Sequence, residues 1–148
     1  MGTRSTIAFI ERRGRGQYDT ELVRVYQQFD GYPSGVGLEL ASWLSEKKII
    51  NGFGMGQTDK LGYCNGIGCM SAQFIRDFKG GIGNLYITTD NDFEDYNYKV
   101  IVENDVITLE AYHWDEAKPF FRGTPNEFIE ALNDGDFDYW EVTDEDWI

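Results

Sequence analysis

The residues whose types and spacing best suit binding chemistry lie in one turn. Residues 26–37 have the sequence Tyr-Gln-Gln-Phe-Asp-Gly-Tyr-Pro-Ser-Gly-Val-Gly. The Asp-Gly and Pro-Ser-Gly steps fix the backbone sharply, and a helix is expected to begin directly after them. A helix N-terminus favours an anion, because its free N–H groups and its dipole both attract negative charge. The turn is therefore predicted to bind an anionic ligand.

The strand before this turn adds a face of suitable side chains. Alternation along it places Arg24, Tyr26 and Gln28 on one side, so a flat ring could stack on a tyrosine while the arginine meets the anion. The alternative is a structural strand-to-helix connection in which Asp30 bonds within its own turn. The predicted ligand contacts here are Arg4, Arg24, Tyr26, Gln28, Asp30, Tyr32, Pro33, Ser34 and Gly35.

A glycine-rich segment, residues 51–68, is the second candidate site. Its pattern lacks the strand–turn–helix context of a dinucleotide fingerprint, and it contains no P-loop. Residues 65–68, Asn-Gly-Ile-Gly, lead into a second predicted helix and form another possible anion nest. Two helix starts would hold two phosphates if they converged, whereas tight packing of loop on helix is the alternative. The predicted contacts of this segment are Asn65, Gly66, Gly68 and Gln73.

Catalytic and metal-binding patterns are weak in this sequence. His113 is the only histidine, and the spacing of Cys64 and Cys69 suits no common zinc site. The carboxylates have no diagnostic spacing. The sequence therefore predicts no cofactor, no metal and no catalytic set, and it favours a binding protein over an enzyme.

Composition and charge limit the partners. The chain has 148 residues, 41% of them hydrophobic, which is enough for one folded domain. Its net charge of −13 argues against general nucleic-acid binding, which requires a basic surface. With no apolar run long enough for a membrane and only two cysteines, we expect a cytoplasmic protein with reduced thiols and no membrane association.

Periodicity predicts an α+β fold, with an antiparallel sheet packed against two or three helices. A hairpin is expected from strands at 3–10 and 21–29, and a meander from strands at 85–89, 96–103 and 106–112, with a short strand at 120–122. Helices are expected at 36–48, 68–79 and 125–132. Residues 1–132 form one domain in this prediction, and residues 133–148 form an acidic, aromatic extension.

Four segments resemble a family of small, mostly uncharacterised proteins of bacteriophages, large DNA viruses and some bacteria. They are Gly-Thr-Arg-Ser at 2–5, residues 26–35, residues 65–73 and Arg-Gly-Thr-Pro at 122–125. The chain departs from that family at Val36, where many relatives have His, and in its acidic, aromatic end.

The resemblance implies a viral source, and small viral proteins without a catalytic set often block host immunity. It is therefore expected that this protein binds and sequesters a nucleotide-derived, cyclic-nucleotide immune signal in the host cytosol without cleaving it. An acidic DNA mimic that inhibits a host defence protein is the first alternative, and a nucleotide-cleaving phosphodiesterase is the second. The expected partner is a small anionic, nucleotide-like ligand, and a homo-oligomer that holds it between protomers stays open.

Overall fold

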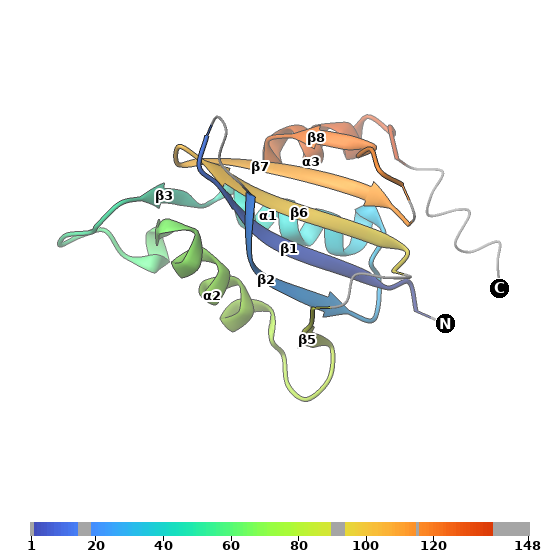
Figure 1. The fold of residues 1–148 in the computed structure, drawn as a ribbon, viewed down its shortest axis with the longest axis horizontal. Helices are drawn as coiled ribbons and strands as arrows, with labels where there is room; N and C mark the ends of the chain where they lie inside the picture. Colours follow the sequence, from blue (N-terminus) through green and yellow to red (C-terminus); the bar gives the residue numbers. More distant parts are fainter. Residues whose placement is uncertain (1, 15–18, 90–93, 115, 138–148) are drawn as a thin grey trace.

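The computed structural model describes residues 2–14, 19–89, 94–114 and 116–137, and it confirms the α+β class (Figure 1). Six strands form one sheet in the order β5-β2-β1-β6-β7-β8, and two short parallel strands, β3 and β4, form a second. The strands are β1 Ser5–Arg12, β2 Asp19–Gln27, β3 Lys48–Ile50, β4 Tyr63–Asn65, β5 Leu85–Ile87, β6 Tyr96–Glu103, β7 Val106–His113 and β8 Phe121–Gly123. The helices are the π-turn η1 Pro33–Gly37, α1 Leu38–Ser45, the short 3-10 turn η2 Asp59–Leu61, α2 Gly66–Phe78 and α3 Pro125–Asn133.

The strand pairings confirm one predicted unit and correct another. β1 and β2 form the expected antiparallel hairpin, although its tip, residues 15–18, lies outside the described residues. The expected meander is wrong in its first strand: β5 pairs with β2 at the sheet edge, and the meander consists of β6, β7 and β8. β1 and β6 pair in parallel, so the sheet is mixed. Residues 85–89 carry no local signal that selects their neighbour, and this explains the error.

One face of the sheet is covered by all three α-helices. Alternate residues of the strands, including Phe9, Val25 and Tyr98, point into a core that also contains side chains of α1, α2 and α3. Figure 1 shows α1 behind the strands and along the length of the sheet. Each large side chain removed from water there contributes about 1.5–3 kcal/mol. The hydrophobic face of every strand is therefore used in one core.

The third helix, α3, begins where the sequence predicts. The Thr124 side chain accepts a hydrogen bond from the Glu127 N–H, and the Glu127 carboxylate accepts one from the Thr124 N–H. Just after the helix, Phe137 is buried and packs against Phe121 and Phe128. The beginning of the acidic, aromatic extension thus adds to the core, while residues 138–148 lie outside the described residues.

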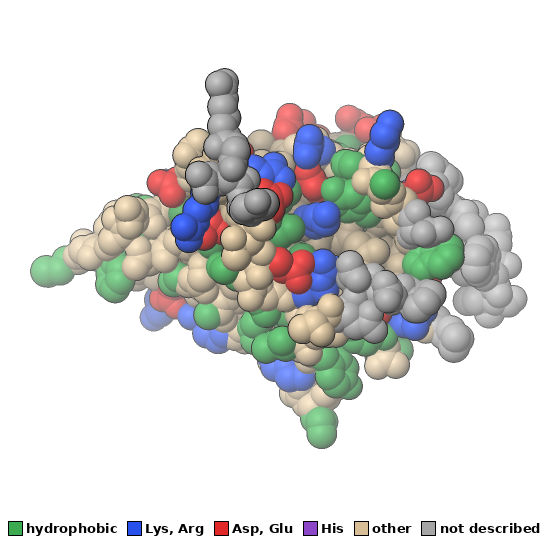
Figure 2. Space-filling view, in the orientation of Figure 1, with side chains coloured by type: hydrophobic (Ala, Val, Ile, Leu, Met, Phe, Trp, Pro, Cys, Tyr) green, Lys and Arg blue, Asp and Glu red, His purple; other side chains and the backbone are tan. Residues whose placement is uncertain are grey.

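The opposite face of the sheet carries polar and charged side chains. A small apolar cluster, Ala8, Ile10 and Ile101, lies at its centre. In the space-filling view of this face, basic and acidic side chains gather over the strands (Figure 2). We call this surface the open face, because in the described part of the chain no α-helix contributes to its apolar cluster.

Candidate functional site

The predicted turn, residues 26–37, is fixed by its own backbone. Asp30 has a positive φ of 58°, and its carbonyl accepts the Val36 N–H at 2.7 Å. Tyr32 accepts from the N–H groups of Gly35 and Gly37. A Cβ at Gly35 would stand 2.2 Å from the Asp30 oxygen, so this position requires glycine. Three backbone N–H groups that were predicted to bind an anion, those of residues 35–37, therefore donate to carbonyl groups within the turn.

The same turn is attached to the start of β1. The Gly31 N–H donates to the Thr3 carbonyl at 2.9 Å, and the Tyr98 hydroxyl donates to the Gly31 carbonyl at 2.7 Å. A Cβ at Gly31 would be 2.9 Å from the Arg4 backbone. Arg4 is exposed beside this turn, and its N–H donates to Asp95. Residues 2–5 and residues 26–35 thus pack on each other, and this packing gives both segments a structural role.

The two predicted halves of the ligand site do not converge. Together η1 and α1 are 13 residues long, or about 20 Å at ~1.5 Å per residue. The turn lies at one end of this helical segment and the glycine-rich segment follows its other end (Figure 1). A ligand of mononucleotide size cannot bridge both places, so each has to be considered by itself.

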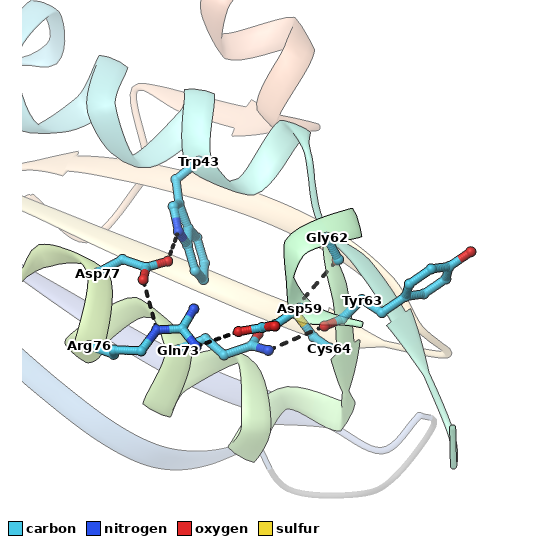
Figure 3. A network of polar contacts seen from close by, with 8 residues as sticks. All are labelled: Trp43, Asp59, Gly62, Tyr63, Cys64, Gln73, Arg76 and Asp77. Carbon is cyan, nitrogen blue, oxygen red and sulfur yellow. Dashed lines mark hydrogen bonds and ion pairs between the residues drawn. The ribbon is translucent and has the colours of Figure 1, made fainter. Parts of the chain in front are cut away.

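At the glycine-rich end, Gln73 is held by β4. Its amide oxygen accepts a hydrogen bond from the Cys64 thiol at 2.8 Å, and its amide nitrogen donates to the Tyr63 carbonyl at 3.2 Å (Figure 3). Burial raises the pKa of the Cys64 thiol to about 11. Gln73 is thus a structural link between α2 and β4, and it also lines a pocket beside α2.

Glycines at the start of α2 differ from those in the turn. Asn65 precedes the helix without making a side-chain cap. A Cβ at Gly66 or at Gly68 would meet nothing within 4 Å. The tight packing of loop on helix that was considered as the alternative is therefore absent at these two positions in the described residues.

Several polar and charged side chains of the described residues meet in one place on the open face. A pocket of about 280 Å³ lies there, and it is lined by Arg24, Asn97, Lys99, Tyr112, His113, Glu116 and Ala117. The strand register explains why Arg24, Lys99 and Tyr112 meet there. Arg24 on β2 is opposite Ala8 on β1, and Ala8 is opposite Lys99 on β6. Two strand spacings separate Arg24 from Lys99, about 9.6 Å between their backbones, and only a methyl group stands between them.

Arg24 is oriented by a network that crosses three strands. It is 8% exposed, and its guanidinium donates to both carboxylate oxygens of Glu21, at 3.2 and 2.7 Å. A third donor, Nη1, lies 3.3 Å from the Thr6 hydroxyl, which in turn donates to Asn97. Tyr26, on the same face as Arg24, packs against Tyr86 with ring centroids 6.1 Å apart. The expected shared face of Arg24 and Tyr26 is thus present.

Lys99 supplies the second positive charge of the pocket. Its ammonium lies 4.7 Å from the centre of the Tyr112 ring, and within the described residues it forms no ion pair. The Tyr112 hydroxyl donates to Glu110, and burial raises the pKa of Tyr112 to about 12. Tyr112 is therefore neutral at pH 7 and presents an aromatic surface next to a cation.

His113 also contributes to the lining of this pocket, although its ring packs against core residues. Its ring stacks on Phe120 with centroids 4.3 Å apart, and burial lowers its pKa below the ordinary 6.5, against a smaller opposite effect of Glu116. His113 is therefore uncharged at pH 7. Among the described residues, the pocket lining thus contains Arg24, which is paired with Glu21, the ammonium of Lys99 and the carboxylate of Glu116, in a protein with a net charge of −13.

Sequence reasoning found Arg24 but missed its neighbours on β6 and β7. Alternation within residues 96–103 does place Asn97 and Lys99 on one face, which was the available signal. Their position beside Arg24 depends on the parallel pairing of β1 with β6, which no local pattern encodes.

The other predicted contacts of the turn lie apart from this pocket lining. Gln28 is exposed just beyond β2, and the Tyr32 hydroxyl donates to Asp30. Pro33 and Ser34 belong to η1.

Within the described ranges, no three His, Cys, Asp or Glu side chains are placed to hold a metal ion. None of the described helices combines the length and the hydrophobicity that crossing a bilayer requires. Comparison with models of protein families, with curated proteins and with solved structures found no match.

Proposed function

We propose that this protein binds a small, anionic, nucleotide-like ligand in the pocket of the open face and holds it without cleavage. The observation that carries the proposal is that two basic side chains, Lys99 and the Glu21-paired Arg24, line one pocket on a protein with a net charge of −13. The sequence resemblance adds a biological setting, in which a viral protein sequesters a cyclic-nucleotide immune signal.

The charges favour a phosphate. Charge-assisted hydrogen bonds to a phosphate are roughly twice as strong as neutral ones. Lys99 has its ammonium over a ring and can turn its three donors toward an anion. Arg24 is buried and already oriented by Glu21, so little conformational entropy is lost when a ligand approaches.

The remaining lining favours a ligand with a polar ring. Asn97 offers an amide, and Tyr112 offers an aromatic face to one side of Lys99. A volume of about 280 Å³ is near the lower end of the range for small-molecule sites, which begins at roughly 300 Å³. This size suits one nucleotide unit, so a larger cyclic nucleotide would place only part of itself in the pocket.

The decisive experiment is retention. The protein is incubated with 3′,5′-cyclic AMP, 3′,5′-cyclic GMP and cyclic di-nucleotides, separated from free ligand and heated, and the released compound is analysed. Intact ligand in the supernatant supports sequestration, and a shortened or opened product instead supports a phosphodiesterase. No retention of any of these compounds contradicts the proposal and favours the acidic mimic.

Variants then place the ligand. Lys99→Met removes one charge-assisted hydrogen bond, worth about 1.5–3 kcal/mol, so the Kd is expected to rise at least tenfold. The matched control is Lys60→Met, in the exposed turn η2 outside the pocket, which is expected to leave the Kd unchanged. Equal affinity of Lys99→Met and the unmodified protein would exclude the open face as the site.

A further inference from the structure

A second pocket lies beside α2, and it shares no residue with the pocket of the open face. Its volume is about 310 Å³, and its lining comes from β3, the glycine-rich segment, β4 and α2. The two pockets differ in chemistry. The open face offers Arg24 and Lys99, whereas none of the described residues that line the α2 pocket is basic.

Asp59 is the one charged side chain among the described residues that line the α2 pocket, and it forms an ion pair. The Asp59 carboxylate accepts a hydrogen bond from the Arg76 guanidinium at 2.6 Å, and this contact lowers the pKa of Asp59. Arg76 also contacts Asp77, whose other oxygen accepts from the Trp43 indole (Figure 3). Asp59 is therefore held as part of a polar network, and the pocket has little preference for either an anion or a cation.

Two amides give the pocket a defined hydrogen-bonding character. The Asn65 oxygen accepts the Gly52 N–H at 2.6 Å, and the Gln57 oxygen accepts the Gly54 N–H at 2.9 Å. These bonds use the acceptor end of each amide, which leaves the NH₂ groups of Asn65 and Gln57 as donors. No described residue accepts a hydrogen bond from either NH₂ group. The pocket thus offers donors to a ligand that carries acceptors.

Its apolar walls favour a flat ring. Ile50 lines one part of the pocket, and Phe53, which is 69% exposed, lines another. Aromatic side chains that are left open to water at the mouth of a pocket are suitable stacking partners for a planar ligand. A pocket with one open ring, an aliphatic wall and two amide donors matches an uncharged heteroaromatic ring with nitrogen or carbonyl acceptors at its edge.

We infer that the α2 pocket is a separate binding site for an uncharged heteroaromatic ring of the nucleobase type. This site is independent of the anion pocket on the open face. Cys69 reports on it directly, because Cys69 lines the α2 pocket and is partly exposed, whereas Cys64 is fully buried with a raised pKa. Alkylation of the native protein is therefore expected at Cys69.

The test measures the rate at which iodoacetamide alkylates Cys69, followed by intact-protein mass spectrometry. The probes are the uncharged nucleosides adenosine, guanosine, cytidine and uridine at millimolar concentration, and equilibrium dialysis of the same compounds provides a second readout that needs no thiol. At least one nucleoside is expected to slow alkylation fivefold or more. If none slows it and none is retained in dialysis, the inference is wrong.

Three variants sharpen the result. Phe53→Ala removes the exposed ring and is expected to abolish protection, while Met55→Ala, fully exposed in the same segment and outside the pocket lining, is expected to preserve it. Equal protection in both variants would contradict the inference. Lys99→Met is expected to leave protection unchanged, so failure of the anion site and failure of the ring site are distinguishable.

Discussion

Glu21 and Arg24 form an ion pair with 2.7 Å between Oε1 and Nη2, although they lie three positions apart on one strand. Residues at this spacing point to opposite faces of a regular strand. The β1–β2 register shifts between Phe9 and Ile10, so that Val23 is opposite Phe9 whereas Glu21 is opposite Ile10. This bulge moves Glu21 onto the open face. The guanidinium in the candidate site is therefore oriented by an irregularity of the strand.

Replacing Glu21 and replacing Arg24 should lower the free energy of unfolding by different amounts. Glu21→Gln leaves a buried guanidinium without its carboxylate and is expected to cost about 1–3 kcal/mol of the free energy of unfolding. Arg24→Met leaves Glu21, whose side chain is 39% exposed, in contact with water, so the cost should be smaller. Urea denaturation of both variants measures the difference. A larger loss for Arg24→Met would show that the guanidinium contributes chiefly through packing.

Two glycines should tolerate alanine very differently. Gly35→Ala places a Cβ against the Asp30 carbonyl and is expected to destabilise the protein by about 1–3 kcal/mol or more. Gly68→Ala meets no atom within 4 Å inside α2 and should stabilise it by up to ~1 kcal/mol, the usual difference between the two residues in a helix. Thermal unfolding compares the two variants. Equal effects would contradict the assigned geometry of the turn.

The capping box of α3 is a third test. Thr124→Ala removes the side chain that accepts the Glu127 N–H and is expected to cost about 1 kcal/mol. Thr58→Ala is the matched control, because Thr58 also precedes a helical turn but makes no side-chain cap there. Chemical denaturation should therefore show a clear loss for Thr124→Ala alone. Similar losses in both variants would contradict a specific capping role.

The lowered pKa of His113 predicts how the free energy of unfolding changes with pH. Its folded-state pKa is lower than the ordinary 6.5 of the unfolded chain, so the folded state favours the neutral ring. The contribution of the neutral His113 ring to the free energy of unfolding is fully present above pH 6.5, and it is lost as the pH falls through the folded-state pKa. The free energy of unfolding should therefore decrease between pH 7.5 and pH 5.5.

The control for this prediction is His113→Phe, which keeps a ring against Phe120 and cannot be protonated. Urea denaturation at both pH values is expected to show a smaller decrease in this variant. An unchanged pH dependence would assign the effect to carboxylates elsewhere in the chain.

Elements with local signals were predictable from sequence. Thr-Pro-Asn-Glu at 124–127 predicted the start of α3 to the residue, and Asn104-Asp105 predicted the β6–β7 turn, where both residues have positive φ. The helix predicted at 36–48 corresponds to η1 and α1, which begin three residues earlier, at Pro33, and end three residues earlier, at Ser45. Such signals involve groups within four or five positions of one another.

Long-range pairing was not predictable in the same way. β3 and β4 have three residues each, too few to show a period, and residues 51–62 separate the two strands in the sequence. For the site, alternation placed Arg24 and Tyr26 on one face correctly. It could not supply Lys99 or Tyr112, because the arrangement across the sheet depends on contacts between distant parts of the chain.

The parallel pairing of β1 with β6 has a consequence for how the chain folds. Thr6 and Asn97, which are partners in the register, are 91 positions apart, so the loop that closes this pairing spans most of the described domain. Such non-local contacts slow folding. At a synthesis rate of roughly 5–20 residues per second, β1 would wait several seconds for β6 to be made. The early hairpin would expose one edge of β1 during that interval, and the open face, with both of its cations, would be completed only at the end of folding.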